Sequence, residues 1–406
     1  MDKFGLIGKT LKHSYSKKIH AKIGEYSYEL IELTPETLKD FVLSNDLKGY
    51  NVTIPYKKDV IPLLDEVDEK ALSIGAVNTV VNSNGKLKGY NTDFDGMCYM
   101  LSRAGIVVKD KKVMILGTGG TSNTAKAVAR HLGAKEIVIV SRSGEVNYQN
   151  YSEHADTDVV INTTPVGMYP NNYSTPVDLN AFNNLSGVAD VVYNPNVTAL
   201  TCQAKQKGIK STNGLSMLVA QAKYAAEKFL NKTIDDSVIE RVLDELESET
   251  LNVVLIGMPG SGKSTVGKLV AKALNREFID TDEELVKRDG RDIPTIFSES
   301  GEEYFRKVES EVLKDVGALT GKVIATGGGV IKNLDNYFAL KSNSVIFWIK
   351  RDLNALATDG RPLSKDMETV KKLYEERKDK YSYFADFVID NSGDISKAVK
   401  GVVEKL

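Results

Sequence analysis

Cysteine, histidine and long apolar runs are scarce in this sequence of 406 residues. Two cysteines, Cys98 and Cys202, are too few for a disulfide framework or a thiolate zinc site. The four histidines have no metal-ligand spacing. No apolar run approaches the roughly 20 residues that span a bilayer, and the first residues do not have the pattern of a signal peptide. These absences predict a cytoplasmic protein.

A strong charge imbalance is missing as well. The formal net charge is −2 and no run of lysine and arginine occurs, which argues against nucleic acid or a membrane surface as the main partner. Hydrophobic residues make up 42% of the chain, enough to build real cores. At roughly 100–200 residues per domain, the length predicts two to four folding units. Monomer and homodimer both stay open.

The hydrophobic pattern divides the chain into two series of strands and helices. In the first series, we expect strands at 3–7, 50–54, 76–81 and 86–90, and then short β-branched strands at 113–116, 137–140, 159–161 and 188–192. Helical patterns separate these later strands. Continuous apolar strands that alternate with helices predict an α/β fold with a parallel sheet covered on both faces.

A charged amphipathic helix over 237–248 ends the first series, with Val238, Val242 and Leu246 on one face. The second series begins with a strand at 251–256, and further strands are expected at 277–279, 323–325, 345–348 and 387–389. We therefore place the main boundary near Glu249.

A glycine-rich turn follows the strand 113–116 and precedes a helix. Its glycines allow close approach to a pyrophosphate, although the spacing departs from strict GxGxxG. The next strand ends at Arg142, which suits a 2′-phosphate and favours NADP(H) over NAD, unless this arginine is only a solvated loop charge. The predicted NADP(H)-binding residues are Gly117, Gly119, Gly120, Thr121, Ser141, Arg142 and Ser143.

A second glycine-rich turn follows the strand 251–256 and fits the pattern GxxxxGK[ST]. Backbone N–H groups cradle the phosphates of ATP, Lys263 reaches the β and γ oxygens, and the Ser264 hydroxyl ligates Mg²⁺. Two acids, Asp280 and Asp282, follow the next strand, and one of them can hold the Mg²⁺ while the other takes the proton of an acceptor hydroxyl. The predicted ATP-binding residues are Gly257, Gly260, Ser261, Gly262, Lys263, Ser264 and Thr265.

Polar residues stand at several strand ends in the first series. Lys57 follows the strand at 50–54, Asn78 precedes a hairpin at Asn84-Gly85, and Asp93 follows it. Alone, such a lysine is usually solvated and such an aspartate often caps a helix. Together with Ser14-Tyr-Ser16 and stretches at 161–168, 190–195 and 213–222, these residues resemble the shikimate dehydrogenase family over about residues 3–245. Two small departures are Ser141, where many relatives have Asn, and Ala199 in place of a common Pro.

The resemblance implies a role for each matching residue. Ser14 and Ser16 would bind the substrate carboxylate, and Lys57 and Asp93 would be the catalytic pair. Reduction of a carbonyl requires a proton on its oxygen, and the sequence does not say which of the pair donates it. The implied ring-oxygen ligands are Thr53, Asn78, Asp93 and Gln221, and the implied lining of the nicotinamide pocket is Tyr193, Gly214 and Met217.

Around the second glycine-rich turn, residues far apart in the chain resemble the shikimate kinase family over about 251–395. The implied shikimate site is Asp282, Arg306, Gly328, Gly329 and Arg377. Asp282 would take the proton of the acceptor hydroxyl, and Asp280 would support the Mg²⁺, directly or through water. Lys263 would assist the transfer, and Arg361 would close over the moving phosphoryl group. The stretch 351–360 is shorter than in many relatives, and the arginine that often packs on adenine has no clear counterpart.

The sequence therefore predicts a fusion that acts on small molecules. Residues 1–102, completed by helices at about 214–247, would bind the dehydrogenase substrate, 103–213 would form a Rossmann-like NADP domain, and 250–406 a P-loop kinase domain. The resemblance implies reduction of 3-dehydroshikimate by NADPH, followed by 3-phosphorylation of shikimate by MgATP. The alternatives are a sensor built from retired catalytic domains, a quinate-type dehydrogenase, or another small-metabolite kinase.

Overall fold

A computed structural model describes residues 2–11, 14–44, 47–356 and 367–406. The chain forms two compact units. One contains 1–194 with 198–245, and the other contains 195–197 with 246–406. Each unit has its own sheets and its own buried apolar clusters, so each is described by itself.

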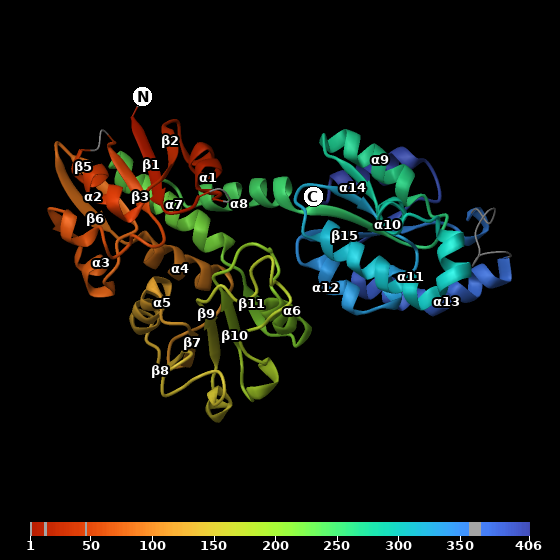
Figure 1. Ribbon diagram of the computed structural model, residues 1–406, viewed down its shortest axis with the longest axis horizontal. Helices are drawn as coiled ribbons and strands as arrows, with labels where there is room; N and C mark the ends of the chain where they lie inside the picture. The colour runs from red at the N-terminus through yellow and green to blue at the C-terminus, as the bar shows by residue number, and fades with distance from the viewer. Residues whose placement is uncertain (1, 12–13, 45–46, 357–366) are drawn as a thin grey trace. The chain divides into compact units, whose positions relative to one another are not determined.

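The N-terminal part of the first unit is a six-stranded mixed sheet with the order β2-β1-β3-β5-β6-β4 (Figure 1). Its strands are β1 (Lys3–Gly8), β2 (Ser27–Glu32), β3 (Gly49–Val52), β4 (Glu66–Val67), β5 (Thr79–Ser83) and β6 (Lys86–Tyr90). The helices between and after them are α1 (Ser16–Ile23), α2 (Pro35–Ser44), α3 (Glu69–Ile74) and α4 (Thr92–Arg103). Asn84 and Gly85 both have positive φ, so they form the predicted hairpin turn between β5 and β6.

The second sheet of this unit has five parallel strands in the order β11-β10-β9-β7-β8. These are β7 (Lys112–Leu116), β8 (Glu136–Val140), β9 (Val159–Asn162), β10 (Gly187–Asp190) and β11 (Lys210–Thr212). Helices α5 (Gly120–His131) and α6 (Ala199–Gln206) connect strands of the sheet. Residues of β7 and β9 enter apolar clusters on both faces, which explains why these strands are apolar throughout.

Two long helices follow these sheets, and the last residues of the second helix, 246–250, belong to the other unit. Helix α7 (Leu215–Leu230) packs against α4, and α8 (Ser237–Thr250) is tied to α1 and α4 by the ion pairs of Glu245 with Lys22 and Glu240 with Arg103. The buried face of α8 consists of Ile239, Val242, Leu243 and Leu246. Val238, predicted on this face, is only half-buried, because Ile239 begins the i, i+3, i+4, i+7 stripe one residue later.

The second unit has one five-stranded parallel sheet with the order β13-β14-β12-β15-β16. Its strands are β12 (Asn252–Ile256), β13 (Phe278–Asp280), β14 (Val323–Ala325), β15 (Ser344–Lys350) and β16 (Phe387–Asp390). The helices are α9 (Lys263–Leu274), α10 (Thr281–Asp289), α11 (Ile293–Gly317), α12 (Asp335–Lys341), α13 (Met367–Phe384) and α14 (Ile395–Val403). Asp280 and Asp292 cap α10 and α11 with their side chains, and Gly301, at φ +80°, kinks α11.

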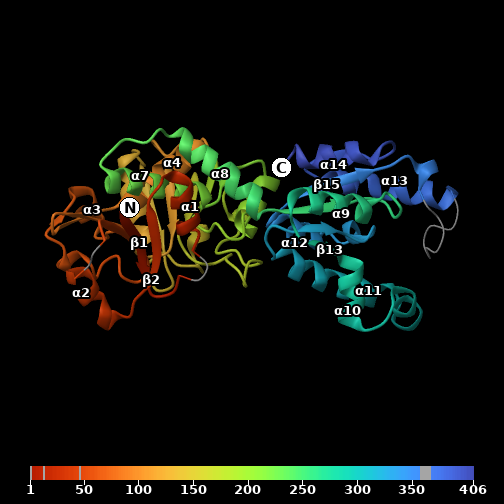
Figure 2. The same ribbon diagram turned by 90° about the horizontal axis from the view of Figure 1, so that it is seen from above.

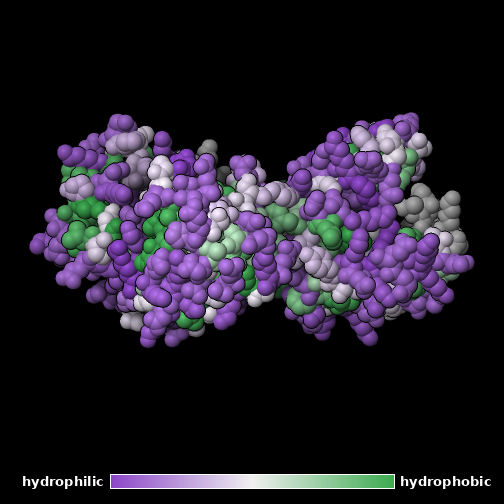
Figure 3. All heavy atoms as spheres, turned by 90° about the horizontal axis from the view of Figure 1, so that it is seen from below, coloured by the Kyte–Doolittle hydropathy of each residue, from purple (hydrophilic) through white to green (hydrophobic). Residues whose placement is uncertain are grey.

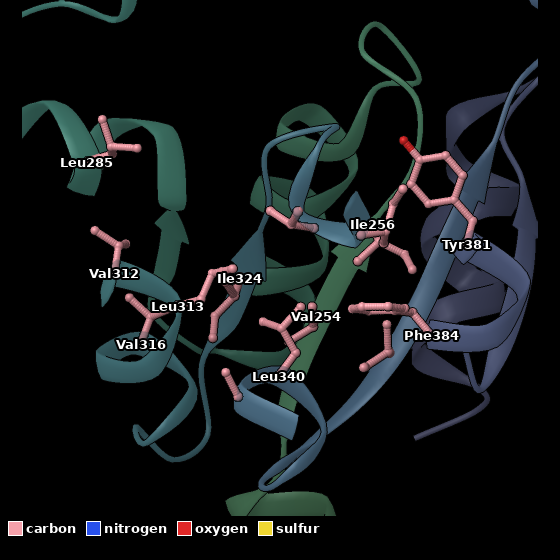
Figure 4. Packing of buried hydrophobic residues seen from close by; sticks show 14 of the residues in the cluster. Val254, Ile256, Leu285, Val312, Leu313, Val316, Ile324, Leu340, Tyr381 and Phe384 are labelled. Atoms are coloured by element: carbon pink, nitrogen blue, oxygen red, sulfur yellow. The ribbon is translucent and has the colours of Figure 1, made fainter. Parts of the chain in front are cut away.

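Alternate residues of β12 face two different clusters. Val253 and Leu255 pack with α9 and α14, which lie side by side (Figures 1 and 2). Val254 and Ile256 face the other way, toward Tyr381 and Phe384 of α13 and Leu340 of α12 (Figure 4). The parallel sheet is therefore covered on both faces, as the sequence predicted.

Several elements begin or end a few residues from their predicted limits. The predicted strand 50–54 ends at Val52 as β3, and the chain then turns, which frees Thr53 and Lys57 to reach a cavity. The strand predicted at 76–81 begins only at Thr79 as β5, since Asn91 Nδ2 donates to the Ala76 carbonyl. The strand predicted at 188–192 ends at Asp190 as β10. Helix α9 begins at Lys263, directly after the glycine-rich turn.

The face of the molecule in Figure 3 is mostly hydrophilic, and hydrophobic residues reach it in small separate patches. Such scattered exposure is normal for a folded chain. No helix within the described residues has the length and apolar character needed to cross a bilayer.

Candidate active sites

The first unit contains a cavity of about 300 Å³ between its mixed sheet and α7. Its walls bring together seven of the residues predicted to bind or transform the substrate and also Tyr193, which was predicted to line the nicotinamide pocket. These eight residues come from six separate stretches of sequence. The lining residues are Leu6, Thr10, Leu11, Ser14, Ser16, Asn51, Val52, Thr53, Lys57, Asn78, Asp93, Tyr193, Leu218 and Gln221.

Lys57 and Asp93 form an ion pair in this cavity. Lys57 Nζ donates to Asp93 Oδ2 at 2.6 Å, and the side chains are only 18% and 11% exposed. Lys57 lies in the turn after β3, and Asp93 lies in the first turn of α4, which Asn91 caps by accepting from Phe94 N. A carboxylate in the first turn is favoured by the helix dipole. The pair therefore presents an oriented ammonium group to the cavity.

Asn78 is fixed by a buried network at the bottom of the same cavity. Its Oδ1 accepts from Thr92 N at 2.7 Å, and its Nδ2 donates to Thr92 Oγ1 at 3.1 Å. Asn51 adds a second layer, since its Nδ2 donates to the Asn78 carbonyl and to Thr79 Oγ1. Fully paired buried amides keep one orientation, so this network sets the direction of the polar groups that face a ligand.

Ser14 and Ser16 contact each other at the start of α1. Ser14 Oγ donates to Ser16 Oγ at 3.1 Å, and Ser16 N donates to Ser14 Oγ at 3.2 Å. The two hydroxyls lie on one wall of the cavity, as a carboxylate site requires. Tyr15, between them, packs on Tyr193 with ring centroids 5.6 Å apart.

The loop that carries Tyr193 is anchored by Asp190. Its carboxylate accepts from Asn162 Nδ2, Val192 N and Thr198 Oγ1 at 2.8–3.0 Å. Burial raises the pKa of Asp190 to about 7, although these three hydrogen bonds oppose the shift. Asp190 therefore acts as a fixed anchor for the segment between β10 and α6.

The predicted dinucleotide turn lies between β7 and α5. Gly117 has φ +108°, and a Cβ there would come within 3.0 Å of Thr163 Oγ1, so only glycine fits. A Cβ on Gly119 or Gly120 would meet open space, which leaves the N-terminus of α5 accessible to a phosphate group. Arg142 and Ser143 are exposed just beyond β8. The glycine-rich turn, the accessible start of α5 and the exposed Arg142 fit a phosphorylated dinucleotide such as NADP(H).

Gly214 and Met217 lie at the start of α7. A Cβ on Gly214 would be 2.0 Å from the Val191 carbonyl oxygen, so this glycine permits close backbone packing. Met217 is 7% exposed and belongs to an apolar cluster with α4 and α5. Neither lines the cavity described above.

The second unit contains a cavity of about 580 Å³ at the carboxyl edge of its parallel sheet. The predicted residues in its wall are Gly260, Gly262, Lys263, Ser264, Thr265, Asp280, Asp282, Arg306, Gly328, Gly329 and Arg377. Ser261 is buried behind them, and its carbonyl accepts from Asn391 Nδ2 at 2.8 Å.

The turn from Gly257 to Ser264 has the backbone of a phosphate cradle. Gly257, Gly260 and Gly262 all have positive φ. A Cβ on Gly257 would lie 2.4 Å from the Ile349 carbonyl oxygen, so this position also requires glycine. Lys263 Nζ donates to the Gly257 and Met258 carbonyls, both at 3.0 Å. The glycines, the lysine and the start of α9 together fit the phosphate chain of ATP.

Ser264 and Asp280 meet at the foot of the cradle. Ser264 Oγ donates to Asp280 Oδ2 at 2.7 Å, and Asp280 Oδ1 accepts from Asp282 N at 3.0 Å. A hydroxyl and a carboxylate are the hard oxygen ligands that Mg²⁺ prefers, with nucleotide phosphates and water as the remaining ligands. Across the described ranges no group of three His, Cys, Asp or Glu could hold a metal. Ser264 and Asp280 therefore fit a Mg²⁺ ion that also takes phosphate oxygens as ligands.

Two arginines lie on another part of the wall. Arg306 Nη1 donates to Glu309 Oε2 at 2.8 Å, and Glu302 contacts its other edge. Arg377 Nη1 donates to the Gly328 carbonyl at 3.1 Å. A Cβ on Gly329 would lie 2.5 Å from the Arg306 guanidinium, so glycine allows this guanidinium to lie against the backbone. Two guanidinium groups in one cavity match a carboxylate ligand.

Comparison with known proteins matches each of the two units to a protein family. Residues 6–80 match the model for the shikimate dehydrogenase substrate binding domain, and 259–406 match the model for shikimate kinase. The shikimate dehydrogenase (NADP(+)) of Clostridium beijerinckii is 38% identical, and the match covers 61% of this chain and 99% of that protein. The chain belongs to the shikimate dehydrogenase family. A shikimate kinase domain follows the dehydrogenase in the same chain.

Several solved structures of dehydrogenases are similar to about 60% of this chain. The chorismate mutase/shikimate 5-dehydrogenase fusion protein of Clostridium acetobutylicum is 36% identical, with a TM-score of 0.58 over 61% of this chain and 97% of that chain. The shikimate 5-dehydrogenase of Thermus thermophilus, solved with NADP(H) and shikimate, is 28% identical, with a TM-score of 0.55 over 60% and 99%. Quinate dehydrogenase from Corynebacterium glutamicum is 28% identical, with a TM-score of 0.56 over 60% and 99%.

Several cavity residues of this dehydrogenase–kinase fusion were not among the predicted site residues. Thr10 and Asn51 line the dehydrogenase cavity, and Glu309 and Arg351 line the kinase cavity. Burial raises the pKa of Glu309, while its contact with Arg306 lowers it. A charged residue three positions after Arg306 was visible on the helix, but only packing shows that it is 2% exposed. Arg361, predicted to close over the phosphoryl group, lies outside the described residues.

Proposed function

We propose that the first unit reduces 3-dehydroshikimate to shikimate with NADPH. The single observation that carries this is the Lys57–Asp93 pair, at 2.6 Å, in a cavity lined by hydroxyls and amides. NADPH supplies the hydride for the carbonyl carbon. The Lys57 ammonium group, oriented by Asp93, polarises the carbonyl oxygen or gives it a proton.

The remaining polar residues hold the ring. Ser14 and Ser16 bind the substrate carboxylate, and Thr53, Asn78 and Gln221 bind ring oxygens through their hydroxyl and amide groups. We place this substrate site on residues 1–102 with 214–247 and the NADP(H) site on 103–213. Gly117 to Thr121 would hold the pyrophosphate, Ser141 to Ser143 the 2′-phosphate, and Tyr193, Gly214 and Met217 would pack near the nicotinamide.

We also propose that residues 250–406 transfer a phosphoryl group from MgATP to the 3-hydroxyl of shikimate. Asp282 lies beside the phosphate cradle and accepts the proton of the attacking hydroxyl. Arg306 and Arg377 hold the substrate carboxylate, with Gly328 and Gly329 allowing close approach. Lys263 neutralises charge on the transferring phosphate, and Ser264 and Asp280 hold the Mg²⁺. Arg361 is proposed as a further phosphate contact.

One assay tests both steps. The chain is mixed with 3-dehydroshikimate, NADPH and MgATP, and shikimate 3-phosphate is measured. Omission of NADPH should abolish the product, and addition of shikimate should restore it without NADPH. Quinate and 3-dehydroquinate are assayed in parallel. Faster turnover with them than with shikimate and 3-dehydroshikimate would make the first unit a quinate-type dehydrogenase. Ligand binding without any turnover would favour the sensor alternative.

A further inference from the structure

Arg351 lies directly after β15, one residue beyond the strand. Its neighbours on both sides are held by backbone hydrogen bonds. Asn391 N donates to the Lys350 carbonyl at 2.7 Å, and Asp352 N donates to Ser392 Oγ at 2.9 Å. The backbone at Arg351 is therefore pinned to the residues that follow β16.

This position lies next to the phosphate cradle. Strand β15 pairs with β12, and Trp348 is opposite Ile256, the last residue before the cradle. The backbone of Gly257 approaches the Ile349 carbonyl so closely that a Cβ would lie 2.4 Å from it. Arg351 lines the 580 Å³ cavity together with Gly260, Gly262 and Thr265. The side chain therefore lies at the carboxyl edge of the sheet, where parallel α/β sheets bind ligands.

Within the described ranges, the guanidinium group of Arg351 lacks the acceptors that the other cavity arginines have. Its Nε is buried and has no hydrogen-bond partner there. Among the residues that the structure describes, none accepts a hydrogen bond from the Arg351 guanidinium group or forms an ion pair with it. Arg306, by contrast, pairs with Glu309, and Arg377 donates to the Gly328 carbonyl, although Arg377 Nε is also buried without a partner in the described ranges. A buried N–H group without an acceptor costs free energy, so a ligand that provides acceptor oxygens there would be favoured.

From this geometry we propose that Arg351 binds the phosphate chain of the nucleotide. The inference rests on the proposed kinase function and adds a residue to its nucleotide site. A phosphate chain offers several anionic acceptors, and a guanidinium group binds them in pairs. The cavity that Arg351 lines also contains the glycines of the cradle and the N-terminus of α9, which favour an anionic phosphate ligand. Arg306 and Arg377 would still bind the substrate carboxylate, as proposed above.

The test compares binding of ADP and of inorganic tripolyphosphate, each with Mg²⁺, by calorimetry on the full chain. Arg351→Met should weaken both ligands by about tenfold or more, because a charge-assisted contact is lost. Arg351→Lys should retain part of the affinity. Arg288→Met is the matched control, since Arg288 is an exposed residue of the same unit that pairs with Asp315. It should bind both ligands as the wild type does.

Two results would overturn the proposal. Unchanged ADP binding in Arg351→Met would remove this residue from the nucleotide site. Weaker ADP binding with unchanged tripolyphosphate binding would place the guanidinium group on the adenosine part. Arg351→Gln and thermal unfolding of each variant separate a local effect from misfolding. If the wild-type chain bound both ligands but transferred no phosphate to shikimate, the proposed function would fail while the role of Arg351 stood.

Discussion

Replacement of Lys57 by methionine tests the proposed reduction most directly. The change keeps most of the apolar stem and removes the ammonium group that lies 2.6 Å from Asp93 Oδ2. Both side chains are more than four-fifths shielded, so water replaces the lost group poorly. Loss of a placed acid usually lowers kcat by about 10²–10⁴, which corresponds to about 2.7–5.4 kcal/mol of barrier.

The assay follows NADPH oxidation with 3-dehydroshikimate as substrate. Lys58→Met is the matched control, since Lys58 is the exposed neighbour in the same turn. Its kcat should equal that of the wild type, and phosphorylation of shikimate by either variant should be unchanged. That second activity reports the amount of chain in each sample whose second unit is folded.

A double-mutant cycle with Asp93→Asn then tests whether the two residues act as one unit. If Asp93 works by orienting Lys57, the double variant should be about as slow as the slower single variant. Reductase activity of Lys57→Met within a factor of a few of the wild type would remove Lys57 from the mechanism. Fully multiplicative losses would refute the pairing.

The remaining predictions concern the cofactor loop, the kinase cavity, a buried histidine and the two units. Arg142→Asp should raise KM for NADPH more than KM for NADH, and an unchanged preference would contradict the assignment of the β8 loop. Glu309→Gln should raise KM for shikimate by about tenfold with little change in KM for ATP, because Arg306 loses the carboxylate that holds its guanidinium group in place. Equal changes in KM for shikimate and for ATP would contradict this role. Burial lowers the pKa of His20 from 6.5 to about 3, so between these two pH values the unfolded chain binds more protons than the folded chain. The free energy of unfolding should therefore have its full value above pH 6.5 and be about 2 kcal/mol lower at about pH 5. Urea unfolding of His20→Asn should lack this dependence on pH. Fragments 1–249 and 250–406 should each unfold cooperatively, since each compact unit has its own core, and a molten fragment would show that the units depend on each other.

Local sequence was enough to predict the phosphate cradle. Gly257, Gly260 and Gly262 adopt positive φ within one short turn, and Lys263 and Ser264 follow directly. Such a backbone conformation is specified by the residues that adopt it, because glycine is nearly free of the steric cost. The same reasoning applies to the hairpin at Asn84-Gly85 and to the apolar strands of both parallel sheets.

The dehydrogenase cavity shows which features a resemblance between sequences can predict and which it cannot. Eight predicted residues line it, but the pattern alone placed Lys57, Asn78 and Asp93 only near strand ends, and the others came from the resemblance. The predicted roles of these residues remain predictions. Met217 illustrates the limit, since its place on α7 was expected and its burial against α4 and α5 was not.

Only the tertiary structure decided which distant residues meet. Lys57 and Asp93 are 36 positions apart, and Asn78 and Gln221 are 143 apart. The strand order β13-β14-β12-β15-β16 brings Arg351 beside the cradle at Gly257, although 94 positions (351 − 257) separate them. Contacts of this kind depend on strand order and packing over the whole unit, which no short stretch specifies. The sequence thus determined the local turns and the chemical groups available, whereas packing determined their partners, their burial and the acceptor that Arg351 Nε lacks among the described residues.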